Sequence, residues 1–197
     1  MKITSANFLT SSPDLERCPE SDLQEFAFIG RSNVGKSSLL NLLAARKDLA
    51  KVSSTPGATR LINFFVMNQK WMLVDLPGYG YAKVRKESRQ EFQRAVSDYL
   101  SQRELLRCVF VLIDSRLTPQ AIDLDFCDWL AVGGISFVLV FTKTDKSKAA
   151  KVKANVDGFL EALSERVEGE PRYFMSSTKT GKGRGEILDF VEQVLKA

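Results

Sequence analysis

The segment from Gly30 to Ser37 carries the most specific set of chemistry-bearing residues in the chain. It reads Gly-Arg-Ser-Asn-Val-Gly-Lys-Ser and fits the pattern GxxxxGK[ST], in which glycines allow consecutive backbone N–H groups to surround a phosphate chain. The predicted helix that follows adds the positive end of its dipole. We expect Lys36 to reach the β- and γ-phosphates of a nucleotide and the Ser37 hydroxyl to ligate Mg²⁺.

A second motif, Asp75-Leu-Pro-Gly78, ends an apolar run farther along the chain. A DxxG pattern at that point predicts that Asp75 holds Mg²⁺ through water and that the Gly78 amide senses the γ-phosphate. Taken alone, Asp-x-Pro-Gly is also a common turn sequence. Its position downstream of a phosphate-binding loop favours the metal-site interpretation.

A third motif predicts which base is bound. Thr142-Lys-Thr-Asp145 follows a buried apolar run and matches [NT]KxD. The Asp145 carboxylate can accept hydrogen bonds from N1 and the exocyclic amine of guanine, and adenine offers no such pair of donors. The motif therefore disfavours the alternative of a P-loop ATPase or nucleotide kinase. Ser176 and Ser177, after the last predicted strand, give a weaker signal for support of Asp145 and contact with the guanine oxygen.

The loop Ser54–Thr59 contains two threonines, Thr55 and Thr59, on either side of a Pro-Gly pair. Either hydroxyl could supply a second Mg²⁺ ligand that closes over GTP. We favour Thr59, because it follows the flexible Pro-Gly pair. Such a loop orders with GTP and relaxes with GDP.

Together the motifs predict one nucleotide site assembled from several segments. The expected catalytic groups are Lys36, Thr59 and Gly78, and the expected metal ligands are Ser37 and Thr59. The residues expected to contact the nucleotide are Gly30, Arg31, Ser32, Asn33, Val34, Gly35, Lys36, Ser37, Ser38, Gly57, Ala58, Thr59, Arg60, Leu61, Asp75, Leu76, Pro77, Gly78, Thr142, Lys143, Thr144, Asp145, Met175, Ser176 and Ser177.

The elements that position these motifs alternate between apolar runs and amphipathic helical patterns. The predicted strands cover 26–29, 61–67, 71–75, 108–113, 137–141 and 172–175. This alternation predicts an α/β fold with a mostly parallel sheet covered on both faces, and the hairpin 61–75 suggests one antiparallel edge strand. Ligands bind beyond the C-terminal ends of such strands, where every motif falls. A helix over Pro119–Val132 is expected to begin with Thr118 as its N-cap.

Length and composition limit the class of protein. We expect an N-terminal extension over 1–24 and one nucleotide-binding domain over 25–197. The absence of histidine excludes histidine triads, imidazole metal ligands and histidine pH switches. Three well-separated cysteines argue against a disulfide framework or a zinc site. No segment approaches the roughly 20 apolar residues of a membrane span, and Met1–Glu20 lacks the apolar core of a signal peptide, so we expect a cytoplasmic protein.

Three segments in register resemble the TRAFAC-class GTPases, and specifically the EngB (YihA/YsxC) family of bacterial ribosome-assembly GTPases. The resemblance runs from Phe26 to the end of the chain. Its marks are Gly30–Ser38, Thr55–Thr59 followed by Ile62–Phe65, and Asp75–Ala82. It implies a Ras-like P-loop NTPase of three α/β/α layers with six strands, which binds GTP and GDP and holds Mg²⁺ through Ser37 and Thr59. It also implies a role in maturing the large ribosomal subunit and a link to septum formation in cell division. We expect a monomer.

Two positions raise hypotheses about catalysis. Tyr79 stands directly after Gly78, where many GTPases carry the glutamine that orients the attacking water. Either intrinsic hydrolysis is slow and water is positioned from elsewhere, or Tyr79 only packs against a partner or the switch. By the resemblance, Asn33 is a candidate ligand for a K⁺ ion that takes the place of an arginine finger; alternatively, its amide stabilises the loop. A nucleotide-gated binding module with negligible hydrolysis remains an alternative to a slow GTPase.

Basic residues cluster around the predicted nucleotide face, and the chain carries a net charge of +4. These residues could contact the phosphate backbone of rRNA, with steep salt dependence, or they could form ordinary solvated helix faces. The cluster consists of Lys83, Arg85, Lys86, Arg89, Lys146, Lys148, Lys151, Lys153, Lys179, Lys182 and Arg184.

Overall fold

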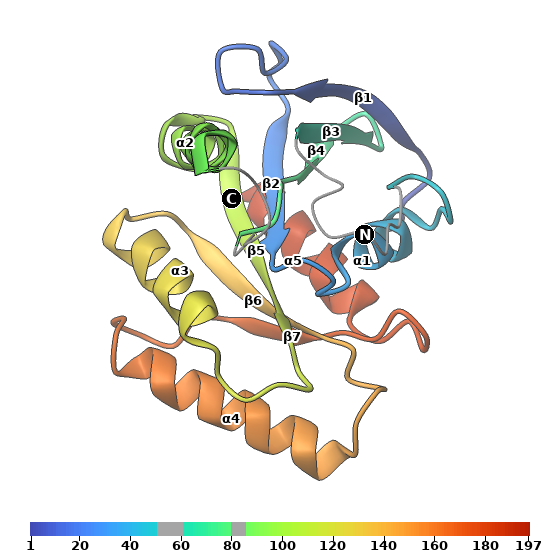
Figure 1. Ribbon diagram of the computed structural model, residues 1–197. Helices are drawn as coiled ribbons and strands as arrows, with labels where there is room; N and C mark the ends of the chain where they lie inside the picture. The colour runs from blue at the N-terminus through green and yellow to red at the C-terminus, as the bar shows by residue number, and fades with distance from the viewer. Residues whose placement is uncertain (51–60, 80–85) are drawn as a thin grey trace.

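The computed structural model describes residues 1–50, 61–79 and 86–197, without the side chains of 86–93. Within that part, a seven-stranded sheet of order β1-β3-β4-β2-β5-β6-β7 forms the centre (Figure 1). The strands are β1 (Ala6–Ser12), β2 (Gln24–Gly30), β3 (Ile62–Met67), β4 (Trp71–Asp75), β5 (Leu106–Asp114), β6 (Phe137–Thr142) and β7 (Tyr173–Met175). The helices are α1 (Lys36–Ala44), α2 (Lys86–Gln102), α3 (Ala121–Val132), α4 (Ala149–Ser164) and α5 (Arg184–Lys196).

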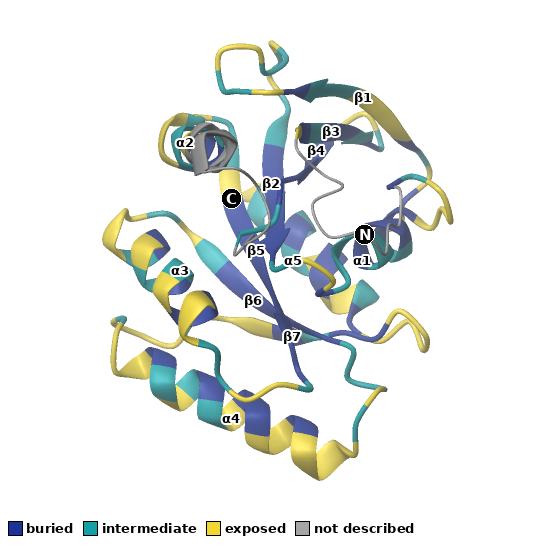
Figure 2. Cartoon of the chain, viewed as in Figure 1, coloured by how far each residue is buried: buried dark blue, intermediate teal, exposed yellow. Residues whose placement is uncertain are grey.

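Helices cover both faces of the sheet and give the three layers expected from the sequence. Side chains of α1 and α5 share one apolar core with strand residues such as Phe28 and Phe110. Side chains of α2, α3 and α4 share a second core with strand residues such as Ile29 and Val111. Neighbouring residues of β2 and β5 thus enter different cores, which is why these central strands are continuous apolar runs and are buried in Figure 2. Among the described residues, no helix is both long and apolar enough to span a bilayer.

The hairpin of β3 and β4 forms as predicted. The two strands pair antiparallel, and Asn68 and Gln69 in the turn have φ values of 52° and 56°. Adjacent residues in the left-handed region allow the tight return of the chain. Strand β4 then pairs in parallel with β2, with Phe28 opposite Asp75. The end of the hairpin therefore reaches the same edge of the sheet as the end of β2.

The sheet has seven strands rather than the six implied by the resemblance, because part of the N-terminal lead-in forms β1. This strand pairs antiparallel with β3 and has a register shift between Phe8 and Thr10. Phe8 and Leu9 are both exposed, so a strict alternation of buried and exposed side chains does not mark the strand in the sequence. Backbone pairing therefore defines β1, and the antiparallel pairings lie together at this side of the sheet.

Helix α3 starts at Ala121, not at Pro119 as predicted. Its N-cap is Gln120, which has extended backbone at φ −106° and ψ 128°. The Gln120 carbonyl accepts the N–H of Asp123 at 3.0 Å, so the helical hydrogen bonds begin there. The carbonyl of Thr118, the predicted cap, instead accepts the Gln120 side-chain amide at 2.9 Å.

Candidate functional site

The predicted phosphate-binding loop joins the end of β2 to the start of α1. A Cβ at Gly30 would lie 2.8 Å from the Leu112 carbonyl oxygen, so a larger residue has no room at this position. Gly35 is the N-cap of α1 with a φ of 106°, in the left-handed region that favours glycine. Between them, the Val34 N–H donates to the Arg31 carbonyl at 3.2 Å. The two glycines therefore permit the curled backbone that a phosphate chain needs.

Lys36 and Asp75, predicted from separate motifs, meet beside this loop. Lys36 Nζ forms an ion pair with Asp75 Oδ1, and the two side chains are 10% and 4% exposed. Asp75 Oδ2 accepts Asn63 Nδ2 at 3.4 Å. Ser37 and Ser38 follow in the first turn of α1, half-buried. The structure thus brings together the predicted phosphate ligand and the predicted metal-site carboxylate, and the residue with the predicted metal-binding hydroxyl directly follows Lys36 in α1.

Gly78 packs directly on the phosphate-binding loop. A Cβ at Gly78 would lie 2.6 Å from the Gly30 carbonyl oxygen and 3.5 Å from the Ser32 nitrogen. The preceding Leu76 donates its N–H to the Phe28 carbonyl at 3.0 Å, which continues the pairing of β4 with β2. The DxxG segment therefore lies where its backbone can meet the distal end of a phosphate chain, and glycine is the residue that fits there.

The predicted base-recognition residues also converge. Asp145 Oδ1 accepts the Ser177 hydroxyl at 2.7 Å, and this hydrogen bond lowers the pKa of the Asp145 carboxyl. Thr144 donates its N–H and its hydroxyl to the Ser176 carbonyl, each at 3.2 Å. Asp145 Oδ2 is shielded from solvent and has no partner among the described residues. A shielded acceptor without a donor is unfavourable unless a ligand supplies one.

Lys143 links the base side of the site to the phosphate side. It has a φ of 59°, and its Nζ donates to the Asn33 carbonyl and to Asp114 Oδ2 at 2.9 Å. Asp114 also forms an ion pair with Arg116 at 2.7 Å. Burial raises the pKa of Asp114, but the hydrogen bonds from Arg116 and Lys143 outweigh it and lower the pKa to about 2. The roles of Asp114 and Arg116 were not predicted; the signal in the sequence is a charged residue at the end of a buried apolar run.

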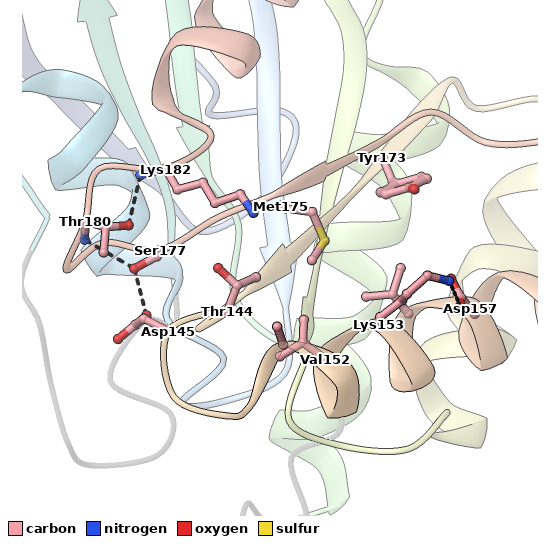
Figure 3. A pocket seen from close by; sticks show the side chains of 12 residues that line it. Thr144, Asp145, Val152, Lys153, Asp157, Tyr173, Met175, Ser177, Thr180 and Lys182 are labelled. Carbon is pink, nitrogen blue, oxygen red and sulfur yellow. Dashed lines mark hydrogen bonds and ion pairs between the residues drawn. The ribbon is translucent and has the colours of Figure 1, made fainter.

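A cavity of about 530 Å³ adjoins the base-recognition residues (Figure 3). Asp145 and Ser177 lie at one end of it, and Tyr173 and Lys153 lie toward the other. Its walls come from α4, β7 and the loop before α5, and the phosphate-binding loop does not line it. The cavity therefore belongs to the side of the site where Asp145 lies.

Tyr79 is held on helix α3. Its hydroxyl donates to Asp123 Oδ1 at 2.8 Å, and its ring stacks on Phe126 with the centroids 4.4 Å apart. Arg31 of the phosphate-binding loop donates to the same Asp123 oxygen at 3.0 Å. Burial raises the pKa of both Tyr79 and Asp123. Asp123 thus joins the two loops. This role could not be predicted, because nothing in the sequence distinguishes Asp123 from the other two aspartates of the predicted helix.

Other predicted residues have no described place in the site or have another role. Gly57, Ala58, Thr59, Arg60 and Thr55 lie outside the described residues, as do Lys83, Arg85 and the side chains of Lys86 and Arg89. Leu61 is 41% exposed. Arg184, one of the basic cluster, donates to the Leu42 and Leu43 carbonyls at 2.8 and 3.1 Å and so caps the end of α1. The remaining lysines of the cluster are exposed.

Comparison with known proteins places these motifs among GTPases. Residues 25–143 match the family model described as 50S ribosome-binding GTPase. The chain is 52% identical over 196 residues to a probable GTP-binding protein EngB of Bacteroides thetaiotaomicron, covering 100% of this chain and 97% of that protein. It is 51% identical over 194 residues to a probable GTP-binding protein EngB of Phocaeicola vulgatus, covering 98% of this chain and 97% of that protein.

Solved structures of GTPases share the fold at lower sequence identity. The crystal structure of a probable GTP-binding protein engB has a TM-score of 0.70 and 21% identity, covering 87% of this chain and 98% of that one. The structure of an Aquifex aeolicus Era variant bound to GDP and AlF4⁻ has a TM-score of 0.67 and 22% identity, covering 89% of this chain and 57% of that one. These likenesses show a common Ras-like fold.

Proposed function

The chain belongs to the EngB family of GTP-binding proteins, and from that premise we propose that it is a Mg²⁺-dependent GTPase with a low intrinsic rate. We further propose that it acts in the cytoplasm, as a monomer, as a nucleotide switch in assembly of the large ribosomal subunit. The ribosomal part is supported by the description of the matching family as 50S ribosome-binding. The link to cell division rests on the family resemblance alone.

The observation that carries the proposal is the partnerless oxygen of Asp145. The Ser177 hydroxyl fixes one carboxylate oxygen, and the other, Oδ2, is shielded and unsatisfied within the described part of the chain. Guanine presents two donors, N1–H and the exocyclic amine, toward a carboxylate in this orientation. Adenine presents an acceptor at N1, which would face the carboxylate and leave it unpaired at a cost of about 1–3 kcal/mol or more. The site therefore favours GTP and GDP over adenine nucleotides.

The residues on the phosphate side fit Mg²⁺. Among the described residues, no group of three or more carboxylates, thiols or imidazoles could hold a metal ion by itself. Mg²⁺ suits such a site, because it keeps several waters and takes one or two protein oxygens together with phosphate oxygens. Ser37 would supply the hydroxyl and Asp75 would hold a bound water, with Thr59 proposed as the second hydroxyl. When bound, the ion would neutralise charge on the β- and γ-phosphate oxygens.

Lys36 and Asp75 would exchange partners when a nucleotide binds. In this structure their charges neutralise each other in a largely buried pair. A triphosphate offers Lys36 a stronger set of anionic acceptors, and a Mg²⁺-bound water offers Asp75 a new donor. Gly78, packed against the phosphate-binding loop, would then donate its amide N–H to the γ-phosphate. This exchange would couple nucleotide binding to the position of the DxxG segment.

Slow hydrolysis is supported by the position of Tyr79. Its hydroxyl and ring are engaged on α3, so Tyr79 is not placed to orient a water, and it lacks the amide with which glutamine does so. Unchanged turnover in Tyr79→Gln would show that the missing glutamine is not the reason for a low rate. Turnover that stays negligible with and without large ribosomal subunits would favour the alternative, a binding module that hydrolyses no GTP.

A K⁺ ion is a further proposed cofactor. Asn33 has a φ of 63° and contributes its backbone carbonyl, not its side chain, to the hydrogen bonds found among the described residues. Its exposed side chain is therefore open to a ligand near the phosphates. We expect hydrolysis to be faster in KCl than in NaCl by about 100-fold, the lower end of the effect of one transition-state donor. Equal rates in the two salts would remove K⁺ from the proposal.

The decisive experiment measures binding of GTP, GDP, ATP and xanthosine triphosphate to the wild type and to Asp145→Asn. We expect the affinity of the variant for GTP to fall by roughly 10- to 100-fold. Its affinity for xanthosine triphosphate should rise, because the Asn amide can donate to the 2-oxo group of xanthine. Asp157→Asn is the matched control, since Asp157 lines the same cavity and is exposed; its GTP affinity should stay within about twofold. ATP binding as tight as GTP binding, unaffected by Asp145→Asn, would overturn the guanine assignment.

A further inference from the structure

The outward face of α3 carries a row of apolar side chains that the proposed function does not use. Ile122, Phe126, Trp129 and Val132 follow one another at helical spacing along one side of the helix. Ile122 is 39% exposed, Trp129 37% and Val132 83%. Figure 2 colours much of the outer side of α3 as exposed. We call these four residues the α3 stripe. Contiguous exposed apolar side chains of this kind mark interaction surfaces more often than scattered ones do.

Aromatic stacking connects the α3 stripe to the nucleotide site. The Tyr79 ring stacks on Phe126 with centroids 4.4 Å apart and planes at 23°. Phe126 stacks in turn on Trp129, at 5.8 Å and 28°. Tyr79 directly follows Gly78, which packs on the phosphate-binding loop. A movement of this segment would therefore change how much of the Phe126 ring the stripe presents to a partner.

The charge of α3 indicates which kind of partner fits. The helix contains three aspartates and no lysine or arginine. Asp123 is buried, Asp128 is half-buried, and Asp125 is 68% exposed while it accepts Arg166 at 2.7 Å. Carboxylates beside an apolar row repel the phosphates of RNA and attract basic side chains. The exposed lysines of the basic cluster that the structure describes lie elsewhere, on α4 and in the loops before α4 and α5.

We propose that the α3 stripe is the docking surface for a basic, amphipathic protein segment of the large ribosomal subunit. This inference rests on the proposed function, in which the chain binds that subunit. Apolar side chains of the segment would cover Trp129 and Val132. Its lysines or arginines would face Asp128 and would compete with Arg166 for Asp125. The partner at this surface is thus a protein, whereas rRNA would contact the lysine-rich sides of the molecule.

The first test compares Val132→Lys with wild type in binding to purified bacterial large ribosomal subunits, in the presence of a non-hydrolysable GTP analogue. The variant removes an apolar contact and adds a charge that repels a basic segment, so we expect the dissociation constant to rise by about tenfold. Leu9→Lys adds the same charge at an equally apolar surface position, 46% exposed on β1. That control should stay within about twofold of wild type. Both variants should keep the wild-type affinity for GTP.

The second test identifies what lies on the stripe. A photoreactive benzophenone side chain in place of Trp129 should crosslink, in the same complex, to a ribosomal protein through a basic segment. Crosslinking to rRNA, or tighter binding by Val132→Lys, would show that the surface meets RNA and would overturn the proposal. Unaltered binding by Val132→Lys together with no crosslink would overturn it as well, while leaving the proposed function intact. Failure of the wild type to bind the subunit would contradict the proposed function and this inference together.

Discussion

The Asp114 carboxylate accepts hydrogen bonds from two cationic side chains, which belong to different parts of the site. Arg116 is a neighbour in the chain, and Lys143 belongs to the base-recognition motif and also contacts the Asn33 carbonyl of the phosphate-binding loop. The carboxylate therefore fixes the Lys143 side chain beside the phosphate-binding loop. Because Asp114 contacts Lys143 directly, its role is to position Lys143 between the two halves of the site.

This residue makes the stability of the protein depend on pH. The pKa of Asp114 is lowered from 3.8 to about 2, so its stabilising effect is fully present above the unfolded-state pKa and is lost as pH falls through the folded-state pKa. The shift corresponds to about 2 kcal/mol at neutral pH, and to about half of that at pH 3. Asp114→Asn should therefore reduce the free energy of unfolding in urea more at pH 6 than at pH 3. A deficit that is the same at both pH values would contradict this account.

Among the elements, helix α3 connects two loops of the site. One of its aspartates accepts hydrogen bonds from the loop after β2 and from the segment after β4. Tyr79 and Arg31 both donate to Asp123 Oδ1, and Asp123 Oδ2 has no partner among the described residues. The tyrosine hydroxyl thus ties the DxxG segment to the helix. In our proposed mechanism nucleotide binding is coupled to the position of that segment, so a bond that holds the segment on α3 would oppose the change that GTP brings.

Tyr79→Phe should therefore favour GTP. Loss of a hydrogen bond to a charged group removes about 1.5–3 kcal/mol of restraint, so we expect the ratio of GTP-analogue to GDP affinity to rise by roughly tenfold or more. The matched control is Tyr99→Phe, which removes a hydroxyl that donates to Glu25 at 2.7 Å, away from the site. That variant should lose stability with no change in the affinity ratio. An unchanged ratio in Tyr79→Phe would show that the tyrosine does not restrain the segment.

At the scale of the whole molecule, a buried polar cluster ties the start of β2 to the end of α2. Glu25 is 0% exposed. Its carboxylate accepts a hydrogen bond from the Tyr99 hydroxyl and forms an ion pair with Arg103 at 2.6 Å. Arg103 also donates to the Pro19 carbonyl at 2.8 Å. The cluster therefore joins the N-terminal segment, the central strand and a helix of the second core.

Removing one partner of that cluster should affect folding and not chemistry. Arg103→Ala leaves the buried Glu25 charge without its cation, which destabilises by about 3–5 kcal/mol. The double variant Glu25→Gln with Arg103→Met removes both charges and should recover a large part of that loss. Thermal unfolding and urea titration would measure both effects. A single variant as stable as wild type would mean that solvent or another group satisfies Glu25.

The sequence predicts those parts of the molecule that local patterns encode. Continuous apolar runs marked the central strands, and motifs at the strand ends identified Lys36, Asp75 and Asp145, which the fold brings to one edge of the sheet. Strand β1 was missed because its pairing with β3 is made by the backbone, and its side chains carry no regular alternation. The role of Asp123 was also hidden, since its partner Arg31 is 92 residues away and only the folded chain brings the two together.

The stacked position of Trp129 also gives the protein a built-in optical probe. The chain has two tryptophans. Trp71 is wholly buried in the first core, so its emission serves as an internal reference that surface events leave unchanged. Trp129 is partly open to water at the end of the row of stacked rings. A spectral change on adding nucleotide would therefore report on this one helix, without a label and in the unmodified protein.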